Sequence, residues 1–278
     1  MNELAFIKMH GLGNDFVILD RRDGKTTLSQ TSVRAIADRR SGIGCDQLII
    51  MEPATTAEAD VFMRIYNPDG SEAGACGNAT RCVAELMMNE KKSDHVIIET
   101  ISGLLDTERT PDGLYSVDMG PAKFDWRDIP LSEACDTLNM PISEGELSGP
   151  VGVSVGNPHA VFFVDDAEAV DLASVGPVIE HHKLFPQRTN VEVVQVLTNN
   201  KIRLRVWERG AGITRACGSG ACAAVVAAAQ RKLTDRTVEV VLDGGSLKIE
   251  WLADNNILMT GPVATSFSGT MAHELLDK

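Results

Sequence analysis

Two stretches decide how this chain folds: RIYNPDGSEAGACGN at residues 64–78 and RLRVWERGAGITRACGS at residues 203–219. Both contain an Arg followed by an aliphatic and an aromatic residue, then a Gly-containing loop, then an Ala-Cys-Gly triplet. The two cysteines, Cys76 and Cys217, lie 141 positions apart, which is close to half the chain. The chain therefore contains an internal duplication, and a duplication sets the architecture before any other feature does.

Two further pairs of dipeptides recur at nearly the same offset: Gly120-Pro121 with Gly261-Pro262, and Gly13-Asn14 with Gly156-Asn157. The period is far too long for a solenoid, so we expect two similar domains that face each other. The first is predicted to comprise residues 1–118 plus 263–278, and the second residues 119–262. Four prolines mark residues 119–150 as a linker with a variable excursion.

Each half shows the same order of elements. Residues 61–66 and 202–207 alternate in polarity, which predicts a strand with one buried face. A helix is expected after each Cys-Gly pair, followed by a second strand at 95–100 and 237–242. The second helix contains ACAAVVAAA and should be buried all round, whereas the first carries one apolar stripe: Ala79, Cys82, Val83, Leu86 and Met87. We predict an α+β fold of two pseudo-symmetric domains, each a curled β-sheet or barrel around a central helix, with the active site in the interdomain cleft.

Composition excludes several classes of protein. The net charge of −13 repels phosphate backbones, and only 13 aromatic residues are available to stack on bases, so no nucleic-acid partner is expected. No apolar run approaches the roughly 20 residues of a membrane span, and the N-terminal segment lacks the pattern of a secretory signal. We read the six cysteines as thiols in a reducing compartment.

Cys76 and Cys217 each precede the start of a predicted helix, where free N–H groups and the helix dipole favour an anion. Both are therefore candidate low-pKa thiols. The alternative is that they are small hydrophobic residues that cap a core helix. Cys82 and Cys222 fall inside the helices and are assigned to the core, while Cys45 and Cys135 have no recognisable context.

Two chemistries use a pair of thiols at matching positions. One is a redox pair that forms a disulfide. The other is the removal of a proton from one face of a carbon and its return to the opposite face, with one thiol ionised and its partner protonated. The second chemistry also needs charge stabilisation on the substrate carboxylate, which paired helix N-termini supply.

Several polar residues suit an amino-acid substrate: Asn14, Gln47, Asn67, Asn157, His159, Asn190, Glu208 and Arg209. An Arg forks onto a carboxylate, and a Glu holds an ammonium group. Taken singly, each Asn also suits a turn, His159 suits a structural role, and the Glu208-Arg209 pair suits a solvated surface. No ligand cluster accompanies His181-His182, so no metal is expected.

The chain resembles the diaminopimelate epimerase family over essentially its whole length. The segments that carry the resemblance are KMHGLGNDF at 8–16, GIGCDQ at 42–47, NPDGSEAGACGNATRC at 67–82, GNPHA at 156–160, TNVEV at 189–193 and WERGAGITRACGSGACA at 207–223. The resemblance implies an epimerase without a cofactor that interconverts LL- and meso-2,6-diaminopimelate, as a cytoplasmic homodimer without a membrane partner.

The resemblance also implies roles for individual residues. Cys76 would donate the proton and Cys217 would accept it in the LL-to-meso direction. Gly77, Asn78, Gly218 and Ser219 would hold the carboxylate at the reacting carbon. The residues expected to fix the substrate, chiefly its distal end, are Asn14, Gln47, Asn67, Asn157, Asn190, Glu208 and Arg209. His159 and Glu208 would tune the thiols.

Two departures from the family pattern are modest, namely Ala79 where Gly is more frequent and Cys45 where another residue type is usual.

Two alternative functions stay open. A racemase acting on proline or hydroxyproline would not need Asn67, Asn190 and Arg209 to hold a second amino-acid end. A thiol redox or interaction protein on the same duplicated fold would leave the Glu208-Arg209 pair without a role.

Overall fold

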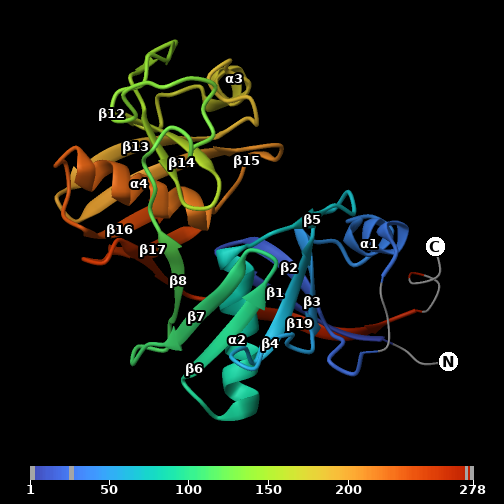
Figure 1. Cartoon of the computed structure of the whole chain (residues 1–278). Coiled ribbons are helices and arrows are strands. Elements are labelled where there is room, and N and C mark those ends of the chain that lie inside the picture. The colour runs from blue at the N-terminus through green and yellow to red at the C-terminus, as the bar shows by residue number, and fades with distance from the viewer. Residues whose placement is uncertain (1–3, 25–27, 273–274, 276–278) are drawn as a thin grey trace. The chain divides into compact units, whose positions relative to one another are not determined.

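The computed structural model describes residues 4–24, 28–272 and 275 (Figure 1). The chain divides into two compact units: Met1–Val117 with Gly261–Lys278, and Asp118–Thr260. Residues 1–3, 25–27, 273–274 and 276–278 of the first predicted domain lie outside the described part of the chain. In that described part, no helix is long and apolar enough to cross a membrane.

The first unit is built mainly from strands. They are β1 (Leu4–Gly11), β2 (Asn14–Asp20), β3 (Gln47–Glu52), β4 (Val61–Tyr66), β5 (Glu72–Ala73), β6 (His95–Thr100), β7 (Gly103–Arg109) and β19 (Ala264–Met271), with helices α1 (Gln30–Ala37) and α2 (Gly77–Lys91). Strand β8 (Tyr115–Pro121) spans the boundary between the units. β19 pairs with β1 in antiparallel fashion, so the C-terminal segment returns to the first unit.

The second unit is likewise built mainly from strands, with two helices. Its strands are β9 (Ser143–Glu144), β10 (Leu147–Ser148), β11 (Val151–Ser154), β12 (Pro158–Val164), β13 (Asn190–Thr198), β14 (Lys201–Glu208), β15 (Gly212–Ile213), β16 (Thr237–Leu242), β17 (Gly245–Trp251) and β18 (Asn256–Gly261), with helices α3 (Leu172–Glu180) and α4 (Gly218–Gln230). The strands predicted at 61–66, 95–100, 202–207 and 237–242 are therefore confirmed, as are both helices after the Cys-Gly pairs.

The order of strand pairing is the same in both units. From β1 to β8, through β2, β3, β4, β6 and β7, the pairs are antiparallel, parallel, antiparallel, parallel, antiparallel and antiparallel. The same series runs from β11 to β18 through β12, β13, β14, β16 and β17. The predicted α+β class and its duplicated architecture are confirmed.

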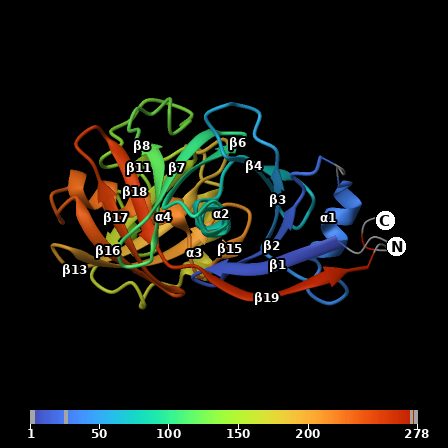
Figure 2. The same ribbon diagram turned by 90° about the horizontal axis from the view of Figure 1, so that it is seen from below.

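A central helix fills the core of each unit. α2 packs against β1, β6 and β7, and Figure 2 shows it end-on among the strands of its unit. Of its predicted apolar stripe, Ala79, Cys82, Val83 and Met87 are buried and Leu86 is half-buried. α4 contacts six strands of its own unit, and every residue from Gly220 to Ala228 is buried. Small Ala and Val side chains allow this close approach, as the sequence predicted.

The prediction of a linker at 119–150 needs correction. Ile129, Leu131, Met140 and Ile142 in this segment are nearly inaccessible and pack into an apolar cluster of the second unit with Phe162. The short hairpin of β9 and β10 also lies here. The prolines therefore shape an irregular but well-packed part of the second unit, and burial of these aliphatic side chains holds it in place.

Candidate active site

Cys76 occupies the N-cap position of α2 in an extended conformation (φ −151°, ψ 103°) and is half-buried. The first hydrogen bond of the helix runs from the Thr80 N–H to the Cys76 carbonyl, at 2.9 Å. Gly77 and Asn78 occupy the first turn of the helix, ahead of this bond, where backbone N–H groups are available to ligands and capping groups. The thiol and these two amides therefore share one helix start, where an anion is favoured.

Asn14 connects the Cys76 thiol to the neighbouring strands. Its side-chain carbonyl accepts hydrogen bonds from the Asn78 amide at 3.1 Å and from the Cys76 thiol at 4.0 Å. Asn78 is in turn held by the fully buried Arg81, whose guanidinium donates to its carbonyl oxygen at 3.1 Å. The Asn14 amide group donates to Asp46 at 3.0 Å. These bonds fix which face of each amide points toward the thiol.

A charged network lies behind Asn14. Arg39 bridges Asp15 and Asp46 with contacts of 2.6 Å to each, and buried Lys8 pairs with Asp15. Burial raises the pKa of Asp15, but hydrogen bonds from Arg39 and Lys8 outweigh it and hold that pKa well below its ordinary value. Asp15 is therefore ionised at neutral pH, and Asn14 is anchored through Asp46.

Gln47 and Asn67 form a second polar pair in the first unit. The Gln47 amide donates to the Asn67 carbonyl oxygen at 3.1 Å, and the Asn67 amide donates to the Ser71 hydroxyl at 3.1 Å. Gln47 begins β3 and Asn67 directly follows β4, the strand paired with β3. All the residues predicted for the site in the first half therefore lie at strand ends or at the start of α2.

Cys217 occupies the N-cap of α4, the position equivalent to Cys76, but it is buried. Its sulfur accepts a hydrogen bond from the Gly220 N–H at 3.4 Å and lies 3.6 Å from the Ser219 hydroxyl. Burial raises the pKa of Cys217 well above its ordinary value, and the charges of Glu208 and Glu192 raise it further. The prediction of a low-pKa thiol is wrong for Cys217, because these effects outweigh its two hydrogen bonds and the helix start.

A hydrogen-bonded series leads away from Ser219 into the core. The Asn157 amide donates to the Ser219 hydroxyl at 3.3 Å, and its carbonyl oxygen lies 2.8 Å from His159 Nε2. His159 Nδ1 lies 2.6 Å from Glu192 Oε1, and both side chains are completely buried. Burial raises the pKa of Glu192, and the charge of His159 opposes that rise. His159 is thus tied to Cys217 through two side chains.

The remaining predicted residues of the second half lie at the end of β14 and beside it. Buried Asn190 donates to the Pro158 carbonyl at 2.9 Å and accepts from the Arg209 N–H at 2.9 Å. The Arg209 guanidinium donates to the Gln187 carbonyl at 3.2 Å. Glu208 accepts a hydrogen bond from the Thr214 hydroxyl. Glu208 and Arg209 are therefore placed by bonds of their own unit before any substrate arrives.

Comparison with known proteins agrees with this arrangement. The family model described as diaminopimelate epimerase matches residues 6–125 and 151–266, one segment for each half. The chain is 60% identical to a diaminopimelate epimerase of Rhodospirillum centenum, over 98% of this chain and 93% of that protein. It is 51% identical to a diaminopimelate epimerase of Gluconobacter oxydans, over 97% of this chain and 99% of that protein. The chain belongs to the diaminopimelate epimerase family. It is therefore an enzyme of the epimerase type.

Solved structures outside the diaminopimelate epimerase family share the fold. A probable proline racemase from Agrobacterium radiobacter superposes with a TM-score of 0.71 at 16% identity, over 99% of this chain and 94% of that one. A hydroxyproline epimerase from Agrobacterium vitis gives 0.70 at 15% identity, over 97% and 92%. At such identities the likeness concerns the fold alone.

The structure of this diaminopimelate epimerase family member also shows residues that the sequence reasoning missed. Asp46 and Arg81 hold Asn14 and Asn78 in the first unit, and Glu192 holds His159 in the second. The apolar residues on both sides of Glu192 in TNVEVVQV hint at a strand that is buried on both faces, which places this acidic residue in the core. Asp46 carried no comparable signal, since its partner Asn14 lies 32 positions away in the sequence. Arg81 bonds Asn78 three positions earlier on α2, a helical spacing that the sequence contains.

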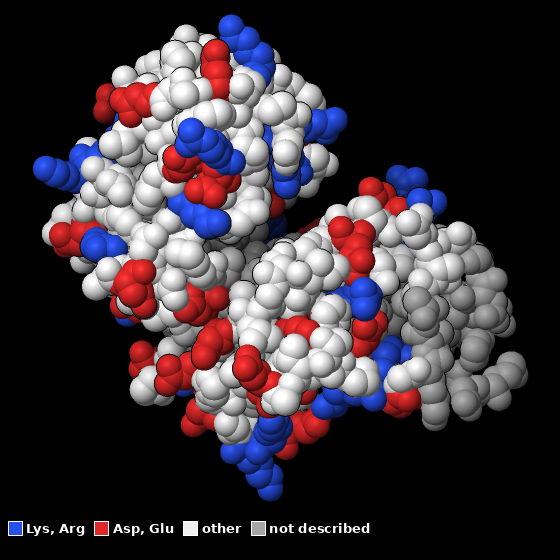
Figure 3. Space-filling model, viewed as in Figure 1, with Lys and Arg blue, Asp and Glu red and all other residues white. Residues whose placement is uncertain are grey.

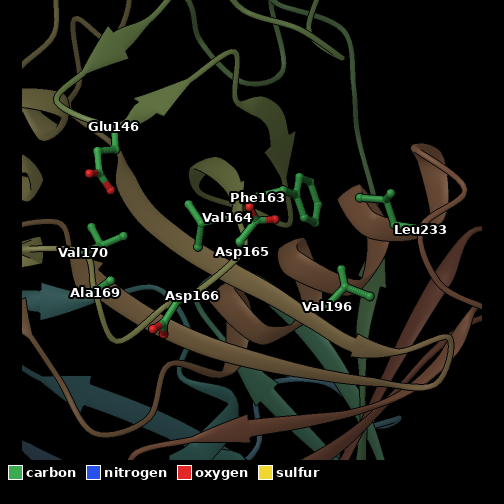
Figure 4. A pocket seen from close by; sticks show the side chains of 9 residues that line it. All are labelled: Glu146, Phe163, Val164, Asp165, Asp166, Ala169, Val170, Val196 and Leu233. Atoms are coloured by element: carbon green, nitrogen blue, oxygen red, sulfur yellow. The ribbon is translucent and has the colours of Figure 1, made fainter.

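The other candidate sites in the described residues give less support for a functional role. Cys82 and Cys222 are completely buried in the helices, which confirms their assignment to the core. No group of three His, Cys, Asp or Glu residues suited to a metal ion occurs within residues 4–24, 28–272 and 275. A hollow of about 600 Å³ in the second unit is lined by Phe163, Val196 and Leu233 with Glu146, Asp165 and Asp166, and contains none of the predicted site residues (Figure 4).

Proposed function

We propose that this epimerase interconverts LL- and meso-2,6-diaminopimelate, with Cys76 and Cys217 as its two bases. The observation that carries the proposal is the equivalent placement of the two thiols, each at the N-cap of the central helix of its unit. A redox pair would need neither the oriented amides beside each sulfur nor the polar residues that surround them. Family membership supplies the substrate class.

The proposed reaction transfers a proton through the reacting α-carbon. In the LL-to-meso direction the Cys217 thiolate takes the α-proton, the electron pair of the C–H bond passes into the carboxylate, and the Cys76 thiol protonates the opposite face. The amides of Gly77, Asn78, Gly218 and Ser219 are suited to hold the carboxylate while negative charge grows on it. One such donor is worth about 2.7–4 kcal/mol in other enzymes. Each of the two domains, 1–118 with 263–278 and 119–262, would contribute one thiol to the reaction.

Burial favours the protonated form of Cys217, which is the proton donor in the meso-to-LL direction. Acceptance of a proton requires the thiolate, which the Gly220 N–H and the Ser219 hydroxyl stabilise. His159 and Glu208 are assigned to tuning of the thiols because His159 is linked to Ser219 through Asn157, and the charge of Glu208 acts on Cys217. The reaction needs no cofactor.

The distal end of the substrate is assigned to polar residues of both halves. They are Asn14, Gln47, Asn67, Asn157, Asn190, Glu208 and Arg209. A second amino-acid end carries one carboxylate and one ammonium group, which match the guanidinium of Arg209 and the carboxylate of Glu208. Proline has no such end, and this difference favours diaminopimelate over the proline racemase alternative.

The decisive experiment measures incorporation of deuterium from heavy water into LL-diaminopimelate, with proline and lysine as comparison substrates and no added cofactor. We expect exchange with diaminopimelate alone, and its loss in both Cys76→Ala and Cys217→Ala. Cys135→Ala is the matched control, because that half-buried thiol lies in the apolar cluster of the second unit. Near-normal exchange in either active-site variant would refute the assignment of the two bases.

We further propose that the enzyme works in the cytoplasm as a homodimer, with an amino-acid substrate and no nucleic-acid or membrane partner. In support, acidic and basic side chains are interspersed on the face shown in Figure 3, without the basic stripe typical of nucleic-acid binding.

For the homodimer, the supporting observation is Phe267 on β19, which is half exposed among exposed neighbours. Sedimentation of the wild type and Phe267→Ala tests the dimer, and a monomeric wild type would contradict it.

A further inference from the structure

The two halves allow a position-by-position comparison of their cores. Phe16 lies opposite Gln47 in the parallel pair β2–β3, and His159 lies opposite Asn190 in the parallel pair β12–β13. Both members of the second pair lie 143 positions after those of the first. Phe16 and His159 therefore occupy equivalent places in the two units.

The same offset and register make Ile49 of β3 equivalent to Glu192 of β13. All four side chains, Phe16, Ile49, His159 and Glu192, are completely buried. The first unit thus folds with an apolar pair at the place where the second unit has an ionisable pair. The fold itself does not require His159 and Glu192 there.

Burial of the Glu192 carboxyl group lowers the stability of the folded state. Its Oε1 contacts His159, but its Oε2 is buried without a hydrogen-bond partner in the part of the chain that the structure describes. A buried carboxyl that lacks part of its hydrogen bonding destabilises a fold relative to an apolar residue of similar size. Because Ile49 shows that an apolar residue fits, the carboxyl of Glu192 is better explained by the site than by the fold.

The hydrogen bonds that begin at Glu192 have one consistent direction. The 2.6 Å contact between Glu192 and His159 Nδ1 holds one proton between them, which leaves Nε2–H to donate to the Asn157 carbonyl oxygen. The Asn157 amide group then donates to the Ser219 oxygen. The Ser219 hydroxyl hydrogen is left for the Cys217 sulfur at 3.6 Å.

We propose that Glu192 is a positioning residue that directs this hydroxyl hydrogen onto the Cys217 sulfur. The inference rests on the proposed function, because it assigns to Cys217 the part of a base. The hydrogen bond of the Glu192 carboxylate is to His159, so Glu192 directs the hydroxyl through His159. Its charge also raises the pKa of Cys217. A carboxyl at this point fixes both the ring orientation and the tautomer of His159, which an aliphatic side chain does not.

Two substitutions separate a positioning role from a structural one. Glu192→Ile copies Ile49 of the other half and removes the partner of His159. Glu192→Gln keeps a donor to Nδ1 and therefore keeps Nε2–H as a donor to Asn157. We expect Glu192→Ile to lower kcat for deuterium exchange by at least about tenfold, with KM within about twofold, since small displacements of a reacting group are costly. Glu192→Gln should stay within about threefold of the wild-type kcat.

The double variant His159→Phe/Glu192→Ile, which reproduces the pair Phe16 and Ile49, tests the structural alternative. We expect it to fold with a melting temperature no lower than that of the wild type, yet to remain impaired in kcat. Glu99→Gln is the matched control, because buried Glu99 accepts a hydrogen bond from the Thr55 N–H at 2.7 Å, in the first unit. It should leave kcat unchanged.

The outcomes are distinguishable. A Glu192→Ile kcat within about twofold of wild type, or a Glu192→Gln variant as impaired as Glu192→Ile, overturns the positioning role. A double variant that fails to fold shows that the pair is structural and also overturns it. Absence of exchange in the wild-type enzyme refutes the proposed function itself, whereas an active wild type with an equally active Glu192→Ile refutes only this inference.

Discussion

Substitution of Gly220 by Ala tests how tightly the Cys217 site is packed. A Cβ built at Gly220, in the first turn of α4, would lie 3.0 Å from Glu192 Oε1 and 3.2 Å from Cys217 Sγ. Both neighbours are buried, so each must give by a few tenths of an ångström inside the core. The equivalent residue of the first unit is Ala79, which lies 141 positions earlier and is tolerated where Ile49 replaces the carboxyl.

Two opposing effects set the magnitude for Gly220→Ala. Ala stabilises a helix by up to about 1 kcal/mol relative to Gly. Overpacking of a tight core costs about 1–3 kcal/mol. The net loss of about 1 kcal/mol corresponds to a fall of about 2–4 °C in melting temperature. Displacement of the sulfur by a few tenths of an ångström should lower kcat by up to about tenfold.

Deuterium exchange and thermal unfolding of the same preparation measure both effects. Ala84→Gly, about two turns after Cys76 in α2, is the control for helix propensity, because it changes that propensity by a similar amount with the opposite sign, and we expect its kcat to stay near that of the wild type. A Gly220→Ala enzyme with unchanged kcat and a raised melting temperature would refute the reasoning, since it would show that Cys217 and Glu192 move aside freely.

Three further outcomes are expected. Burial raises the pKa of Cys45 from about 9 to about 11, so between these pH values the folded state keeps a proton that the unfolded chain loses. The free energy of unfolding should therefore fall as the pH rises through this range. In Cys45→Ala, denaturant titrations should show a slope that is smaller by up to about 1.4 kcal/mol per pH unit. An equal slope would contradict this. Asp15→Asn leaves buried Lys8 without its carboxylate partner and should cost about 3 kcal/mol of unfolding free energy at pH 7, whereas a loss below 1 kcal/mol would mean that Lys8 finds another partner. Peptide mass spectrometry after iodoacetamide treatment at pH 8 should show slower alkylation of Cys217 than of the less buried Cys76, because burial raises the pKa of Cys217; equal rates would show that the buried thiol opens readily.

Much of the fold followed from local patterns. The alternating segments at 61–66 and 202–207 became β4 and β14, because one face of each strand packs on the core and the other does not. The all-apolar stretch ACAAVVAAA became the interior of α4 for the reason that predicted its burial, since small apolar side chains on every face leave no face for water. The duplication then supplied the repeated order of elements, which no single segment shows.

What the sequence did not predict depends on contacts between distant segments. Residues 119–150 looked like a linker because prolines mark irregular chain, yet irregular backbone packs well when side chains such as Ile129 and Met140 find a core. The pKa of Cys217 was misjudged because the helix start is visible in the sequence, while burial and the approach of Glu192 and Glu208 are tertiary.

The contrast between the two sulfurs gives the clearest argument for distinct roles on a shared scaffold. At Cys76 the thiol donates a hydrogen bond to the Asn14 carbonyl oxygen at 4.0 Å. At Cys217 the neighbours are the Gly220 N–H and the Ser219 hydroxyl, both able to donate to the sulfur, while burial and the charges of Glu208 and Glu192 raise the pKa of this thiol. A two-base epimerase needs one thiolate and one thiol at the start of a turnover. The duplicated backbone makes the two positions equivalent, and the side chains behind them, an Asn tied to Asp46 and a Ser tied through Asn157 and His159 to Glu192, make them chemically different.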